Sequence, residues 1–138
     1  MIEVFCTVKH APSEGKTGDC IRACVASILE MPTDQVEHFA EGEAGLLNVR
    51  LREWLKPLGY APWWSHFDGA QDRATVLTAI GETMPDCHYV LFGRLASGSP
   101  HAVVCRGGEV VHDPSWAPMP MTQCSTLGTW TVLVIAKA

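Results

Sequence analysis

The chain has 138 residues, of which 47% are hydrophobic and 18% are charged. This length and composition predict one globular domain with a buried core, and they exclude disordered, collagen-like and low-complexity classes. Lys and Arg total 10 against 15 Asp and Glu, for a formal net charge of −5, and the basic residues are scattered. We therefore expect no nucleic-acid partner, because such binding relies on clustered basic side chains that neutralise phosphates.

Apolar stretches are short throughout the sequence. The longest, Val132 to Ala136, is far shorter than the about 20 residues that a membrane-spanning helix needs. The N-terminal segment, Met1 to His10, has no basic start followed by an apolar run, so it does not resemble a secretory signal. These features predict a cytoplasmic protein with no membrane partner.

Helical periodicity appears in three segments of the N-terminal part. Residues 20–31 place apolar side chains on one face and small side chains on a second, which predicts a central and largely buried helix. A short turn is expected over residues 34–39. Residues 46–58 and 72–83 repeat leucine, valine and isoleucine at helical spacing, and each is expected to form a further helix.

The pattern changes to strands after Pro85. Four runs rich in β-branched and aromatic residues are expected to be strands, over residues 87–92, 101–105, 109–112 and 129–135. Because the helices precede the strands along the chain, we predict an α+β fold in which helices pack on a C-terminal antiparallel sheet, rather than alternating βαβ units.

Cys20 begins the most buried of the predicted helices, directly after Gly18 and Asp19. Unpaired backbone N–H groups and the positive end of the helix dipole favour a thiolate at this position, which makes Cys20 a candidate nucleophile. Asp19 would oppose this if its carboxylate were free, but as an N-cap it would bind helix N–H groups instead. Cys24, one turn later, is expected to pack in the core.

A nucleophilic cysteine needs a base, and His101 stands at the head of a predicted strand. Asp113 follows after the Gly107-Gly108 turn and a short return strand, so a hairpin would hold the carboxylate beside the imidazole. A flush two-residue turn would put Asp113 on the opposite face of the sheet and make His112 a rival base. We therefore predict a one-residue bulge that restores the shared face, or an Asp113 just beyond the strand.

The segment around Cys20 and the hairpin with His101 and Asp113 resemble parts of papain-fold cysteine peptidases, especially the bacteriocin-leader-processing peptidases and their stand-alone relatives. Residues 18–29 are similar to the nucleophile helix, and residues 101–104 and 110–114 are similar to the His strand and Asp-Pro hairpin, in the same order. The first block also resembles small bacteriophage and proteobacterial proteins. The resemblance implies a single papain-like domain over residues 1–138 that acts on a protein or peptide, with Cys20 as nucleophile, His101 as base and then acid, and Asp113 as orienter.

The sequence departs from that family at the oxyanion donor. Papain-type enzymes carry Gln six residues before the cysteine, and that position here is Glu14. A carboxylate cannot stabilise an oxyanion unless it is protonated. Either the Cys20 N–H works with another donor, for which the candidates are Lys16, Thr17 and His10, or hydrolysis is weak or absent.

Three functions therefore stay open. A cysteine peptidase or amidase cleaving an amide, isopeptide or thioester is the first, with acyl transfer by the same triad as its variant. A catalytically lapsed papain-like module with a binding or inhibitory role, favoured by Glu14, is the second. A redox protein using Cys20 and Cys24 is the third.

Six cysteines are spread over the chain, and because it has a core and no export signal we expect free thiols rather than disulfides. No Cys-x-x-Cys or His-x-x-x-His pair occurs, so neither a metal nor a cofactor is expected. A zinc site could draw only on dispersed residues: Cys20, Cys24, Cys87, His88, His101 and His112. Four histidines are expected to be surface or locally bonded side chains: His10, His38, His66 and His88.

The tryptophans divide into two expected groups. Trp54 and Trp130 are expected in or at the edge of the core. Trp63 and Trp64 are candidates for the edge of a substrate groove, and Trp116 could shelter the imidazole and carboxylate from water. Groove-lining loops are expected at residues 40–45 and 64–71.

Overall fold

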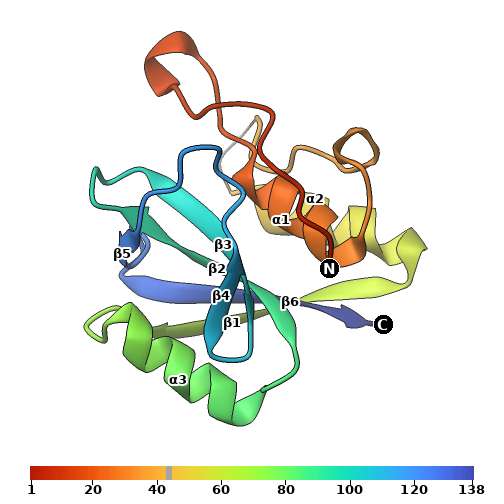
Figure 1. Ribbon diagram of the computed structural model, residues 1–138. Coiled ribbons are helices and arrows are strands. Elements are labelled where there is room, and N and C mark those ends of the chain that lie inside the picture. The colour runs from red at the N-terminus through yellow and green to blue at the C-terminus, as the bar shows by residue number, and fades with distance from the viewer. Residues whose placement is uncertain (43–44) are drawn as a thin grey trace.

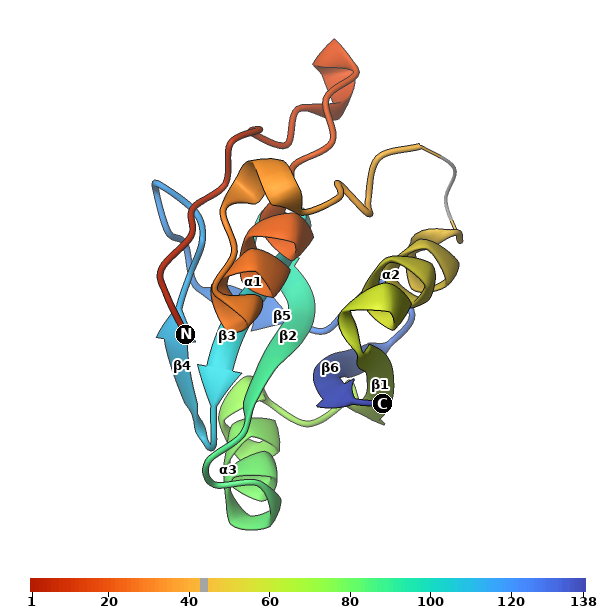
Figure 2. The same ribbon diagram turned by 90° about the vertical axis from the view of Figure 1, so that its right-hand side faces the viewer.

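The computed structural model describes residues 1–42 and 45–138, and these form an antiparallel sheet with helices on both faces (Figures 1 and 2). The helices are α1 (Cys20–Leu29), α2 (Leu47–Leu55) and α3 (Arg73–Thr83). The strands are β1 (Tyr60–Asp68), β2 (His88–Leu95), β3 (Pro100–Arg106), β4 (Glu109–His112), β5 (Met121–Gln123) and β6 (Thr129–Lys137). The predicted α+β class is confirmed.

The sheet has the strand order β1-β6-β2-β3-β4, with β5 paired to the end of β2, and every pairing is antiparallel. β1 was not predicted, and it lies between α2 and α3 in the chain, so the expectation that all strands follow Pro85 is wrong. Pro62 reads as a strand breaker in the sequence. It is tolerated here because β1 is an edge strand, where a missing N–H need not cost a ladder hydrogen bond.

Side chains of the central strands alternate between two hydrophobic cores. Val90, Ala102 and Leu133 face α1 and α2. Their neighbours in sequence, including Leu91 and Val103, face α3. Figure 2 shows α1 and α2 above the sheet and α3 below it. Because β2 and β3 are buried on both faces, they read as nearly continuous apolar runs.

All three helices differ slightly from their predicted ranges. α2 covers Leu47–Leu55, and a separate 3-10 helix follows at Lys56–Leu58. α1 ends at Leu29 because Glu30 takes a left-handed conformation, with φ 57°. α3 begins at Arg73, after an N-cap in which the side chain of Asp72 accepts a hydrogen bond from the N–H of Thr75 at 2.8 Å. No helix in residues 1–42 and 45–138 is long and apolar enough to cross a bilayer.

The N-terminal segment, residues 2–8, runs between α1 and the chain that follows β4 (Figure 2). The N–H of Ile2 donates to the carbonyl of Ser27 at the end of α1. The N–H of Cys6 donates to the carbonyl of Pro114 at 2.9 Å. This segment therefore links the helix that carries Cys20 to the hairpin that carries Asp113.

Candidate active site

Cys20 is the first residue of α1, and its side chain is partly exposed at the surface. The predicted capping of α1 by Asp19 is wrong, because no side chain caps the helix. The backbone of Asp19, at φ −109° and ψ 32°, is not in the extended conformation from which an N-cap side chain reaches helix N–H groups. As a result the N–H of Cys20 donates to no group in the described part of the chain.

The carboxylate of Asp19 is instead fully buried against the N-terminal segment. It accepts hydrogen bonds from the N–H groups of Thr7 and Val8 at 3.0 Å, from Thr7 Oγ1 at 2.6 Å and from Arg22 Nη2 at 2.7 Å. Burial would raise the pKa of Asp19, but these donors outweigh burial and hold it below its ordinary value. The carboxylate is thus engaged by the N-terminal segment and Arg22 rather than by the N–H groups of α1.

His101 and Asp113 meet across the β3–β4 hairpin. The turn itself is flush, because Arg106 pairs with Glu109 and Cys105 with Val110. The register then shifts, and Val104 pairs with His112, which leaves Val111 as an extra residue in β4.

The predicted bulge is therefore present, although at Val111 rather than in the glycine turn. Asp113 lies one residue beyond the end of β4, on the His101 side of the sheet. Its Oδ1 lies 2.8 Å from Nε2 of His101. The same oxygen accepts a hydrogen bond from the N–H of Ser115 at 3.0 Å, which fixes the carboxylate.

The imidazole of His101 is nearly buried, and its pKa is changed by burial and by two neighbouring side chains. Burial would lower the pKa of His101, but interactions with the side chains of Asp113 and Cys20 outweigh burial and raise its pKa from 6.5 to about 9. Burial would likewise raise the pKa of Asp113, but the hydrogen bonds from His101 and Ser115 lower it. At neutral pH the ring therefore carries a proton on each nitrogen, with Nε2 facing Asp113 and Nδ1 left for Cys20.

All six cysteines are free thiols. Cys6 lies near Cys20, and burial together with the charges of Cys20 and Asp19 raises its pKa to about 12. Cys24 is completely buried, and burial raises its pKa well above the ordinary value. Both of these neighbours are therefore held as protonated thiols. In the described residues, no group of three or more His, Cys, Asp or Glu side chains is close enough to hold a metal ion.

His112 lines neither cavity, in spite of its place next to Asp113. It is buried, and its Nε2 lies 2.7 Å from the carbonyl oxygen of Val4. Since a carbonyl only accepts, this nitrogen must carry a proton. His112 thereby anchors the N-terminal segment, and its ring packs edge-on against Phe5.

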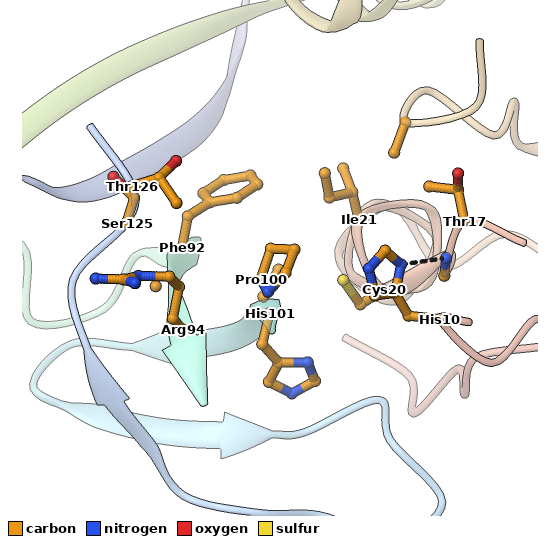
Figure 3. A pocket seen from close by; sticks show the side chains of 14 residues that line it. His10, Thr17, Cys20, Ile21, Phe92, Arg94, Pro100, His101, Ser125 and Thr126 are labelled. Carbon is orange, nitrogen blue, oxygen red and sulfur yellow. Dashed lines mark hydrogen bonds between the residues drawn. The ribbon is translucent and has the colours of Figure 1, made fainter. Parts of the chain in front are cut away.

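Two cavities open on either side of the Cys20 and His101 side chains. The smaller, of about 200 Å³, is lined largely by apolar groups such as Ile21 and Phe92 (Figure 3). The larger, of about 590 Å³, extends along the N-terminal segment to Trp116. The residues common to both linings are His10, Gly18, Cys20, Pro100 and His101. An extended substrate could therefore occupy both cavities with its reacting bond at the sulfur.

The five tryptophans lie in different environments. Trp116 borders the larger cavity, is 75% exposed and stacks on Phe5. Trp63 and Trp64 lie on β1 and line neither cavity, although Trp64 packs against Phe92, which does. Trp130 is buried, and Trp54 packs at the edge of the core, as predicted.

The two loops expected to line the groove contribute little. In the loop at 40–45, Ala40 borders the smaller cavity, and residues 43–44 lie outside the described part of the chain. The segment 64–71 borders neither cavity, because most of it belongs to β1.

The four residues considered around the oxyanion position differ in whether they line the cavities. Glu14 and Lys16 line neither cavity. Thr17 borders the smaller cavity, and its carbonyl lies 2.9 Å from Nε2 of His38. His10 borders both cavities together with Cys20.

Some residues of the site were not found from the sequence. Arg22 and Thr7 hold Asp19, and Cys6 lies near Cys20. The spacing of Asp19 and Arg22, three residues apart in one helix, could have indicated their ion pair. No sequence signal indicated the N-terminal segment, because many of its contacts are made by backbone groups.

Comparison with known proteins adds no relative. No family model, no curated protein and no solved structure matches this chain.

Proposed function

We propose that this protein is a thiol hydrolase of papain-like design, a cysteine peptidase or amidase that cleaves an amide, isopeptide or thioester bond. The observation that carries the proposal is the 2.8 Å bond between Nε2 of His101 and Oδ1 of Asp113. It orients the imidazole so that its other nitrogen is available to the side chain of Cys20, at the start of α1.

The protonated state of His101 suits an ion-pair mechanism. With a pKa of about 9, the ring is an imidazolium at neutral pH and serves as counter-ion to a Cys20 thiolate. The thiolate attacks the carbonyl carbon, and Nδ1–H of His101 gives its proton to the leaving amine, alkoxide or thiolate. The now neutral ring takes a proton from water as that water attacks the acyl-enzyme, which releases the acid and restores the ion pair.

The paired cavities support a chain-like substrate. Because both cavities meet at Cys20 and His101, the acyl part could lie on one side of the sulfur and the leaving group on the other. A protein or peptide has the length for both. Acyl transfer would need only an amine or thiol acceptor in place of water, with the same three residues.

The function can be tested with p-nitrophenyl acetate, an activated ester that needs no specific groove. The wild-type protein should release one equivalent of p-nitrophenolate in a burst and carry the acetyl group on the peptide containing Cys20, as seen by mass spectrometry. Cys20→Ala should abolish the burst. His66→Ala, which changes an exposed histidine on β1, should leave it unchanged.

A lapsed, purely binding module makes the opposite prediction. Glu14 is the observation that favours it, since that side chain offers no oxyanion donor and lines neither cavity. Folded wild-type protein that is never acylated at Cys20, under conditions where its sulfur is alkylated, would rule out the hydrolase and support this second function. Incubation of active protein with a peptide library, followed by identification of new termini, would then define the bond that is cleaved.

A further inference from the structure

The loop before α1 is closed at its base, and this places His10 where the missing glutamine would be needed. Ala11 and Lys16 exchange two backbone hydrogen bonds, each of 3.0 Å. Glu14 therefore lies within a closed loop, outside both cavities. His10 and Gly18, which flank this closed loop, are brought together beside Cys20.

The ring of His10 is oriented by a backbone hydrogen bond. The N–H of Gly18 donates to Nδ1 of His10 at 3.1 Å. Because a backbone N–H can only donate, Nδ1 must be the unprotonated nitrogen of the ring. With Nδ1 unprotonated, the ring proton is on Nε2, and this N–H donates to no group in the described part of the chain.

The donor on His10 lies in the same part of the site as Cys20. His10 and Cys20 line the same two cavities. In Figure 3 the ring of His10 is drawn beside Cys20, with one ring nitrogen in the hydrogen bond to Gly18 and the other turned toward the side of the sulfur. The backbone N–H of Cys20, at the start of α1, has no capping side chain in the described residues.

The fit of His10 depends on a glycine at position 18. A Cβ atom added there would lie 2.8 Å from Cβ of His10 and 3.1 Å from its backbone nitrogen, closer than side chains pack. The carbonyl of Thr17 is held from the other side by Nε2 of His38, at 2.9 Å. The base of the loop is thus clamped on both sides, and His10 lies directly on the start of α1.

We infer that His10 is the oxyanion donor of this protein, and that Nε2–H of His10 and the backbone N–H of Cys20 together bind the oxygen of the tetrahedral intermediate. This inference rests on the proposed hydrolase function. It supplies an oxyanion donor in place of the one that Glu14 cannot provide, and the lack of that donor is what argues against catalysis. Losing one such donor typically costs about 100-fold to 1,000-fold in rate.

Two substitutions separate donation from support of the loop. In His10→Gln, the side-chain amide nitrogen falls where Nε2 of the histidine was, but the partner of the Gly18 N–H is lost. In His10→Asn, the amide oxygen falls where Nδ1 was, so the Gly18 bond can form, but no donor reaches the position of Nε2. A donor role predicts that Gln preserves function better than Asn, whereas a structural role predicts the reverse.

The rate of acylation by p-nitrophenyl acetate and the rate of alkylation by iodoacetamide should be measured on each variant. Acylation forms an oxyanion, but alkylation does not. We expect His10→Asn to be acylated about 100-fold more slowly than the wild type, and His10→Gln within about tenfold of it. Alkylation of Cys20 should be unchanged in both, and His66→Ala should match the wild type in both assays.

The possible failures can be told apart. A wild-type protein that is not acylated would overturn the hydrolase proposal, and this inference with it. Acylation of His10→Asn at the wild-type rate would overturn the donor role alone and leave the hydrolase intact. Parallel loss of acylation and alkylation in His10→Asn would also overturn it, because His10 would then act on the sulfur or the fold rather than on the oxyanion.

Discussion

Nε2 of His101 lies 2.8 Å from Oδ1 of Asp113, although the turn that joins their strands is flush and by itself would put the two side chains on opposite faces. The extra residue in β4, Val111, reverses the face of everything that follows it. The orientation of the base therefore depends on a backbone irregularity two residues away from the carboxylate.

The first prediction concerns Asp113→Asn. Removing the charge takes away the main partner that raises the pKa of His101 above 6.5, so this pKa should fall from about 9 toward its ordinary value. Acylation at neutral pH should fall by about 100-fold, because the ring is no longer held as a charged acid. NMR titration of the His101 ring and the ester burst would measure the two effects.

Asp86→Asn is a matched control for this change. Asp86 forms an exposed ion pair with Arg106 near the same hairpin, so its loss alters the local charge equally without touching the site. A pKa of His101 that stayed near 9 in Asp113→Asn would contradict the assignment of Asp113 as orienter.

A second prediction links His101 to stability. The folded protein binds the His101 proton more tightly than the unfolded chain, with a pKa of about 9 against 6.5. The resulting stabilisation is fully present below pH 6.5 and is lost as the pH rises through about 9. The free energy of unfolding of the wild type relative to His101→Gln should therefore fall by up to about 3 kcal/mol between pH 6 and 9.5.

Urea denaturation of both proteins at the two pH values would measure this difference. Subtracting the variant removes the contribution of groups that titrate elsewhere in the chain. A gap between the two proteins that is constant, or that widens as the pH rises, is incompatible with a raised pKa of His101.

The sequence was informative wherever local pattern and tertiary structure agree. α1 and α3 were predicted because their apolar side chains repeat at helical spacing. The pairing of His101 with Asp113 was predicted from parity along a hairpin, since a glycine turn and two short strands leave few possible registers.

Other features depend on contacts that no local pattern encodes. β1 is a strand because β6 offers it a partner along its whole length, which outweighs the breaking tendency of Pro62. Asp19 binds Thr7 and Val8 because the N-terminal segment returns to α1. The position of the bulge at Val111 also depends on pairing within the folded sheet.

A third prediction is selective alkylation of Cys20. Burial raises the pKa of Cys6 and Cys105 to about 12 and that of Cys24 well above its ordinary value, so these thiols should not react with iodoacetamide at pH 7. Cys20 is partly exposed beside an imidazolium and should be labelled. Peptide mapping by mass spectrometry would give the rate at each site.

The same molecule holds an internal control for this experiment. Cys124 is partly exposed. It lies in the connection between β5 and β6, distant from His101 in the sequence. His101→Ala should slow labelling of Cys20 by tenfold or more and leave Cys124 unchanged. Equal labelling of Cys20 in both proteins would show that the imidazole does not activate the sulfur.

The last prediction concerns Arg22→Ala and the N-terminal wall of the larger cavity. The carboxylate of Asp19 is completely buried, and Arg22 is its only charged partner in the described residues. Removing one member of a buried pair leaves an uncompensated charge, so we expect a loss of about 3 kcal/mol in the free energy of unfolding. Thr7 and Val8 line the larger cavity, and their N–H groups are held by hydrogen bonds to this carboxylate. The N-terminal segment of Arg22→Ala should therefore also become more sensitive to proteolysis.

Urea denaturation and limited proteolysis would measure these two effects, with Arg52→Ala as the control. Arg52 is an exposed residue of α2, and its loss should change stability by less than about 0.5 kcal/mol. If Arg22→Ala were as mild as this control, the ion pair would be dispensable, and hydrogen bonds from Thr7 and Val8 would suffice to hold the buried charge. If the loss is large while Cys20 in the folded fraction is still alkylated at the wild-type rate, Arg22 supports the cavity wall without acting on the sulfur.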